Sequence, residues 1–192
     1  MRRLSVAALL AVCMWAVLAV VMSPRLVASD DNREIAVTDD CDPSAAGGWG
    51  PGGCLRVEGS VTRPEFLAFL FSPLIATGHV PVGHPSWRIQ PAFLAVEVGK
   101  ELTVSNTGGR GHTFTEVAQY GGGFVAALNG TETGVAPECA AIATSPGVAN
   151  PNILAPGASM EVAGLAVGNH KFQCCIHPWM RGDVKVVVDD DK

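Results

Sequence analysis

The chain has 192 residues, of which 48% are apolar and only 16% are charged, with 22 Gly and 13 Pro. Soluble domains usually carry about 25% charged residues, so this composition favours short strands and turns over ion-paired surface helices, and it excludes disorder as the main state. The formal net charge is −5 and the chain contains no basic block. Nucleic acid is therefore not an expected partner, because binding it needs a cationic surface.

The first 29 residues have the pattern of an export signal. Arg2 and Arg3 precede an apolar run over 4–22, and small residues follow before Asp30. This order is typical of a secretory signal peptide. The run is also close to the roughly 20 residues of a membrane-spanning helix, so residues 1–29 are predicted to be a signal peptide or a membrane anchor that tethers the protein. Both alternatives export the rest of the chain, to a periplasmic, extracellular or outward-facing membrane-anchored location.

Cysteine usage agrees with export. Five cysteines follow the apolar run, and an odd number outside the cell indicates one thiol with a role other than a disulfide. Cys41 and Cys54 flank a Gly/Pro-rich segment that a disulfide could close. The unpaired thiol is then one of Cys139, Cys174 and Cys175.

The segment after the signal is acidic and poor in large apolar residues. Residues 30–56 are therefore predicted to be a mobile leader, and residues 57–192 the folded domain. Acidic residues lie at both ends of the exported chain, at 30–31, 39–40, 42 and 189–191. Such residues can steer a basic partner or simply improve solubility.

A short helix is predicted near the start of the folded domain. Thr62 and Glu65 have the spacing of a capping box, in which each side chain satisfies a backbone N–H group of the first helical turn. The apolar residues that follow predict a helix over 63–71, which ends before Pro73. We expect it to pack on the main domain, with membrane contact as the alternative.

The remaining segments predict strands and turns. Apolar or alternating segments lie at 87–98, 101–105, 112–117, 159–165, 170–174 and 182–188. Short strands separated by Gly and Pro turns favour an antiparallel β-sandwich or barrel. The stretch 119–158 is too long for an ordinary connection, so we expect it to contain a strand or two or to be pinned to the domain.

Three possible metal ligands lie close together near the C-terminal end of the domain. Cys174, His177 and Met180 have the spacing Cys-x-x-His-x-x-Met. One Cys, two His and a weakly bound Met form the ligand set of blue-copper electron-transfer sites. The best-placed second histidine is His112, which begins a predicted strand directly after the turn over 106–111.

These segments resemble the cupredoxins, the blue copper proteins, with the compact ligand spacing of amicyanin. The resemblance rests on the segments 101–114 and 170–188 and extends from about Trp87 to Val188. It implies an all-β fold, a Greek-key cupredoxin β-sandwich, here with a short N-terminal helix and a long loop. It also implies one type-1 copper ion held by His112, Cys174, His177 and Met180.

The resemblance also assigns the adjacent cysteines. Neighbouring side chains of a strand point to opposite faces, so if Cys174 faces the metal, Cys175 faces away and can pair with Cys139. The expected disulfides are then Cys41–Cys54 and Cys139–Cys175.

The predicted function is that of an exported one-electron carrier, not an enzyme, because four protein ligands leave no position open for a substrate. Its expected partner is an unidentified redox protein, for example a cytochrome or a membrane oxidoreductase. One alternative is a copper-binding or storage module without a redox partner. Another is a structural exported domain whose metal is incidental, with zinc as a candidate because Cys and His also suit Zn²⁺.

Overall fold

The computed structural model describes residues 33–72, 83–130, 132, 134–143 and 153–188. The predicted signal or anchor over 1–29 lies outside these residues. Within the described ranges, no helix has both the length and the apolar character needed to cross a membrane.

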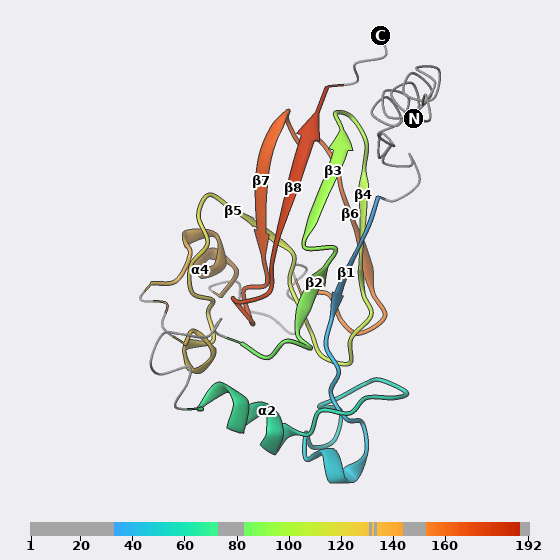
Figure 1. Ribbon diagram of the computed structural model, residues 1–192, viewed down its shortest axis with the longest axis vertical. Helices are drawn as coiled ribbons and strands as arrows, with labels where there is room; N and C mark the ends of the chain where they lie inside the picture. Colours follow the sequence, from blue (N-terminus) through green and yellow to red (C-terminus); the bar gives the residue numbers. More distant parts are fainter. Residues whose placement is uncertain (1–32, 73–82, 131, 133, 144–152, 189–192) are drawn as a thin grey trace, which may run out of the picture. The chain divides into compact units, whose positions relative to one another are not determined.

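Two four-stranded sheets form the body of the structure (Figure 1). The first sheet contains, in spatial order, β2 (Arg88–Gln90), β1 (Glu34–Thr38), β4 (Leu102–Asn106) and β6 (Ser159–Val162). The second contains β3 (Phe93–Glu97), β8 (Arg181–Val187), β7 (Gly168–Gln173) and β5 (Thr115–Val117). The all-β sandwich predicted from the sequence is confirmed.

Strand pairing is mixed, whereas the sequence analysis expected antiparallel pairing. β1 pairs in parallel with β4, and β3 pairs in parallel with β8, while the other pairs are antiparallel. The chain changes sheet at every connection except β1–β2 and β7–β8. Such crossovers allow neighbouring strands to run in the same direction without a tight hairpin.

The core lies between the sheets and follows the two-residue alternation of the strands. Leu102 and Val104 of β4 are fully buried, as are Val184 and Val186 of β8. Burying an aliphatic side chain of this size contributes roughly 1.5–3 kcal/mol. The alternation therefore fixes which face of each strand turns inward, including the faces that carry the candidate ligands.

The structure differs from the leader predicted over 30–56. β1 lies within that range and is an interior strand of its sheet, between β2 and β4. Ile35 and Val37 are 2% and 0% exposed, whereas Glu34, the first residue of the strand, is exposed. The sequence analysis missed this short strand because the acidic, Gly-rich composition of the whole segment outweighed the alternation of its few apolar residues.

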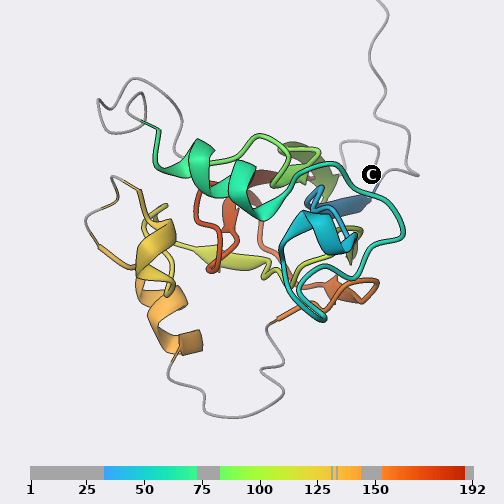
Figure 2. The same ribbon diagram turned by 90° about the horizontal axis from the view of Figure 1, so that it is seen from below.

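Helical segments lie at one end of the sandwich and along one side (Figure 2). Helix α2 (Arg63–Leu70) begins at Thr62, whose side chain accepts a hydrogen bond from the Glu65 N–H, as the spacing predicted. A short 3-10 helix, Ala45–Gly47, precedes it. In Figure 1 both helices lie at the end of the sandwich where a loop connects β7 to β8.

The long stretch 119–158 contains helices where a strand had been expected. Its described parts include the 3-10 helix Ala126–Leu128 and helix α4 (Pro137–Ala143), while 144–152 lies outside the described residues. A disulfide between Cys139 of α4 and Cys175 joins this stretch to the end of β7. The expected pinning is therefore present.

Candidate metal centre

Cys174 follows β7 directly and begins a short loop that returns to β8. The Cys174 N–H donates to the Met180 carbonyl at 3.0 Å, and the Met180 N–H donates to the His177 carbonyl at 2.9 Å. These bonds close the loop on itself between two paired strands. Cys174, His177 and Met180 are 0%, 4% and 1% exposed, so the loop holds three potential ligands away from water.

His112 reaches the same place from a separate part of the chain. Its backbone exchanges two hydrogen bonds with Leu154, at 3.1 and 2.7 Å. The preceding turn is fixed by Asn106, whose side chain donates to the carbonyls of Arg110 and Leu154 and accepts from the Gly108 N–H. His112 is fully buried as a result.

The structure brings three of the four predicted ligands into one cluster. The Cys174 Sγ atom lies 3.8 Å from the His112 Nδ1 and 3.7 Å from the His177 Nδ1. The potential ligand atoms of these residues all lie within 4.8 Å of one another, and the described residues contain one such group of His, Cys, Asp and Glu side chains. Both imidazoles therefore present the same ring nitrogen to the sulfur.

This spacing fits a first-row metal ion. An ion bonded to nitrogen at about 2.0 Å and to sulfur at about 2.3 Å, with about 120° between the bonds, separates the two atoms by about 3.7 Å. The Cys174–His112 and Cys174–His177 separations match that value. The donor set, one sulfur and two imidazole nitrogens, suits copper and zinc.

The electrostatics of the cluster favour a deprotonated sulfur. Burial alone would raise the pKa of Cys174, but hydrogen bonding with His112 and His177 brings that pKa well below the ordinary thiol value. The Thr113 N–H also donates to the Cys174 Sγ at 3.3 Å. A thiolate is the form of cysteine that binds metals, so this environment is compatible with Cys174 as a metal ligand.

The two histidines differ in their surroundings. Burial lowers the pKa of His177. Burial also opposes a charge on His112, yet the hydrogen bonds to Asp39 and Cys174 raise the pKa of His112 to about 9. The difference comes from the opposite ring nitrogen, since the His112 Nε2 lies 2.8 Å from the Asp39 Oδ2.

Asp39 is a site residue that the sequence analysis did not assign. Its side chain is fully buried, and burial would raise its pKa, but the hydrogen bond from His112 and those from the Arg110 and Cys41 N–H groups hold that pKa below the ordinary value. In the sequence Asp39 belongs to a group of acidic residues that were expected to steer a basic partner or to improve solubility. The usable signal was the two-residue alternation of Ile35 and Val37 in β1, which the buried Asp39 continues just beyond the end of the strand.

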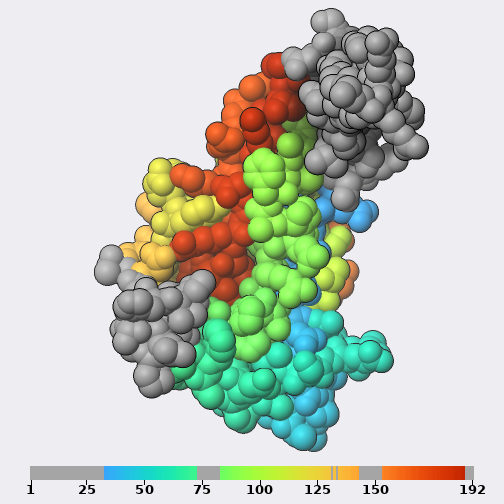
Figure 3. All heavy atoms as spheres, in the orientation of Figure 1, coloured from blue at the N-terminus to red at the C-terminus, as the bar shows by residue number. Residues whose placement is uncertain are grey.

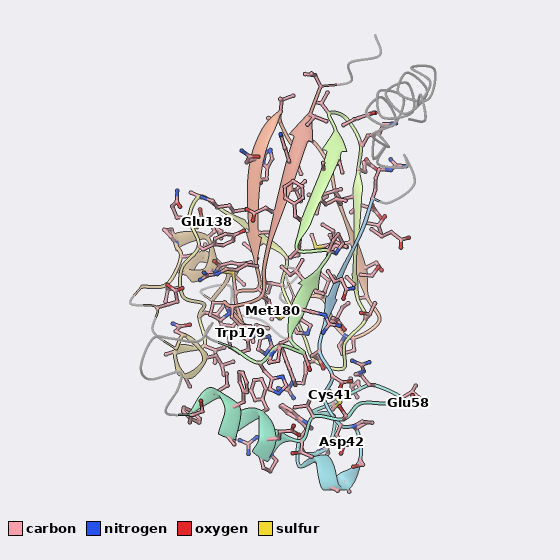
Figure 4. The ribbon with its side chains drawn as sticks, viewed as in Figure 1. Cys41, Asp42, Glu58, Glu138, Trp179 and Met180 are labelled. Carbon is pink, nitrogen blue, oxygen red and sulfur yellow. A yellow bond between two sulfur atoms is a disulfide. The ribbon has the colours of Figure 1, made fainter. Side chains whose placement is uncertain are left out.

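The fourth predicted ligand, Met180, lies in the same loop and at the same end of the sandwich. Figure 4 places Met180 and Trp179 where the strands face α2. The Met180 backbone is tied to both Cys174 and His177. Ligation through its sulfur stays a prediction.

An aromatic layer covers the loop over residues 174–180. The ring centroid of Trp179 lies 5.5 Å from that of His177 and 6.2 Å from that of Phe66, on α2. A Cβ atom at Gly83 would lie 1.9 Å from the Trp179 ring, so only glycine allows this close approach. Figure 3 shows residues of the 40–72 segment forming the surface at this end.

The disulfide pattern agrees with this site. The structure contains Cys41–Cys54 and Cys139–Cys175, both as predicted, and among the described residues Cys174 is the free cysteine. Cys174 packs with the main core, and Cys175 belongs to a second cluster with Val117 and Ile142. The strand alternation thus separates the free cysteine of the cluster from a disulfide cysteine at the adjacent position.

Comparison with known proteins finds similar solved structures but no match by sequence. No family model and no curated protein matches the chain. Similar solved structures include a purple cupredoxin from Nitrosopumilus maritimus, at 17% identity and a TM-score of 0.38, covering 80% of this chain and 98% of that chain. Oxidized plastocyanin from Dryopteris crassirhizoma matches at 15% identity and a TM-score of 0.37, covering 80% of this chain and 99% of that chain.

Amicyanin is also among the similar structures. A reduced-state variant matches at 20% identity and a TM-score of 0.31, covering 50% of this chain and 70% of that chain. All three are cupredoxins, the family that the sequence resembles. The class defined by the fold and the site of this chain is an all-β sandwich with a buried Cys-His-His group at one end that could hold a metal ion.

Proposed function

We propose that this protein is an exported type-1 copper protein that carries single electrons between redox partners. The observation that supports the proposal is the buried cluster in which the Cys174 sulfur faces the Nδ1 atoms of His112 and His177. Met180, in the same loop, would supply the thioether that completes a blue-copper ligand set. Copper bound there would change between Cu(II) and Cu(I) and so supply a one-electron step.

The protein's own contribution is to hold the donor atoms still. The Thr113 N–H fixes the Cys174 sulfur, and the Cys175 N–H donates to the Thr113 hydroxyl at 2.7 Å. The Leu154 bridge and Asp39 fix the backbone and ring of His112. Because these groups are buried and bonded in one arrangement, little movement would accompany a change of one charge unit.

Electron transfer is favoured over catalysis by the same arrangement. With Met180 as a ligand, protein side chains would fill the positions around the metal, and a substrate would find none open. The His177 ring, which is 4% exposed, lies behind Trp179. We infer that electrons pass between the site and a cytochrome or membrane oxidoreductase on the Trp179 side.

Export is supported by the two disulfides, Cys41–Cys54 and Cys139–Cys175. Disulfides persist in oxidising compartments and are rare in the cytosol. The location that we propose is periplasmic, extracellular or anchored to the outer face of a membrane, in agreement with the pattern of residues 1–29.

Voltammetry of the copper-loaded full chain tests the proposed function. An electron carrier should give a reversible one-electron couple and should be reduced and reoxidised repeatedly without losing copper. Tight Cu(I) binding with no reversible couple would instead indicate a storage module. Preferential uptake of zinc with no redox signal would indicate a structural metal.

A further inference from the structure

Asp39 makes a direct connection between the N-terminal part of the chain and a candidate metal ligand. It follows the last residue of β1, is 1% exposed, and places Oδ2 2.8 Å from the His112 Nε2. The two residues are 73 positions apart in the sequence. This contact belongs to the segment that the sequence analysis treated as a leader.

All acceptor positions of the Asp39 carboxylate are used. Oδ1 accepts from the N–H groups of Cys41 and Gly109, both at 3.2 Å. Oδ2 accepts from the Arg110 N–H at 2.9 Å and contacts His112. A carboxylate offers about four lone-pair sites, so the orientation of this group is fully determined by its surroundings.

The surrounding backbone is shaped to admit this carboxylate. A Cβ atom at Gly108 would lie 2.1 Å from the Asp39 Oδ2. One at Gly109 would lie 2.6 Å from the Cys41 sulfur, which the disulfide to Cys54 holds in place. The turn before His112 and the segment after β1 therefore fit closely together.

The geometry also determines which nitrogen of His112 is free. A carboxylate that receives backbone N–H bonds is an acceptor, so the proton of a neutral His112 ring resides on Nε2. Nδ1, which faces the Cys174 sulfur at 3.8 Å, is then left with a lone pair for a metal. A carboxylate bonded to the far nitrogen of a ligand histidine orients the ring and increases its basicity.

We propose that Asp39 is a positioning residue for His112, which keeps the proton on Nε2, directs Nδ1 to the metal and stabilises Cu(II) relative to Cu(I). The proposal rests on the proposed copper function for its redox consequence. A more basic nitrogen and a nearby negative charge both favour the more highly charged ion. The native carboxylate therefore lowers the reduction potential of the site.

The test compares Asp39→Asn with Asp40→Asn in the copper-loaded full chain. Both variants remove one negative charge from the same segment, but Asp40 bonds to Ser60 and Arg56, away from the ligands. Asp39→Asn should lower the Cu(II)-to-Cu(I) affinity ratio at least tenfold, which corresponds to a rise in potential of about 59 mV for one electron. Equal potentials in the two variants would overturn the proposal.

A second measurement uses the unmodified protein, so it does not depend on whether a variant folds. In Zn(II)-loaded or Cu(I)-loaded protein, nitrogen-15 NMR should show His112 with a slowly exchanging proton on Nε2 and the metal on Nδ1. Metal on Nε2, or a proton on Nδ1, would refute the assignment. If the NMR result is as expected but no reversible copper couple exists, the electron-carrier function fails while the role of Asp39 stands.

Discussion

Cys174 and Cys175 are adjacent in the chain but have different chemical surroundings. Cys174 faces two imidazole nitrogens, and its pKa is lowered by hydrogen bonding with His112 and His177, which outweighs the opposing effect of burial. Cys175 is oxidised to a disulfide with Cys139. Strand alternation and the Cys-x-x-His spacing are both local properties, which is why the sequence predicted the Cys139–Cys175 disulfide and the placement of Cys174 beside His177.

Met180 provides a test at the scale of one residue. Met180→Gln should lower the reduction potential, because an amide oxygen is a harder ligand than a thioether and favours Cu(II). Met180→Leu has a similar volume but no donor atom, and should not lower the potential. Voltammetry of both variants checks this; if Met180 only fills the core, the Gln variant should show no lowering relative to the Leu variant.

The burial of Asp39 and its contact with His112 could not be predicted from the sequence. A buried carboxylate is exceptional unless it is paired, and its partner His112 lies far away in the sequence. Composition placed Asp39 among exposed acids. Only the three-dimensional pairing of β1 with β4 brings it beside the turn that precedes His112.

At the scale of elements, helix α2 packs through Phe66 at the end of the sandwich that contains the Cys-His-His cluster. This side chain is 5% exposed and its ring centroid lies 4.5 Å from that of Trp87. Phe66→Ala should destabilise the fold by about 3–5 kcal/mol because it leaves a cavity, and should speed copper loss. Phe71→Ala is the matched control, since Phe71 is 69% exposed and its removal should cost within about 0.5 kcal/mol.

Denaturant unfolding and the rate of copper transfer to a chelator measure these effects. Equal behaviour of the Phe66 and Phe71 variants would show that α2 does not support the site. The helix itself was predictable, because Thr62 and Glu65 form a local capping signal. Its packing against Trp179 was not, because that contact depends on the tertiary fold.

The pairing of β5 with β7 includes a pH-sensitive contact. The His170 Nδ1 lies 2.6 Å from the Glu116 carboxylate, and this bond, with the Ala166 carbonyl, raises the pKa of His170. A raised pKa in the folded state adds stability that is fully present below the unfolded pKa of about 6.5 and is lost as pH rises through the folded pKa. Because Glu116 is exposed, the contribution should stay below about 1 kcal/mol.

His170→Gln should therefore destabilise the protein near pH 6 and have little effect near pH 9. Unfolding free energies at the two pH values check this. Glu116→Gln should remove the same contribution, and the double variant should lose no more than either single variant. A His170→Gln effect that is equal at both pH values would contradict the assignment.

At the scale of the whole molecule, metal binding should add to a fold that already has its own core. Copper at 100 times its dissociation constant should stabilise the folded state by about 2.7 kcal/mol, or roughly 5–10 °C in Tm for a domain of this size. Calorimetry with and without copper measures the shift. Cys174→Ser should keep the fold and lose most of the shift; an equal shift in that variant would place the copper elsewhere.

The sandwich as a whole was predictable because its strands alternate buried and exposed residues with period two. The parallel pairs β1–β4 and β3–β8 were not, because strand partners are chosen by crossovers between the sheets. The helix α4 within 119–158 was not predicted, and its Cys139 is joined to Cys175, which lies outside that stretch. Local sequence patterns thus predicted the loop that contains Cys174 and His177, whereas the pairing of distant strands brings Asp39 beside His112.

The most direct test of the central claim is the visible absorption spectrum of the full chain after addition of Cu(II), recorded with electron paramagnetic resonance. A type-1 site should give an intense blue thiolate-to-copper band and a narrow hyperfine splitting, and Cys174→Ser should abolish the band. A colourless protein, or a spectrum unchanged in Cys174→Ser, would contradict the account.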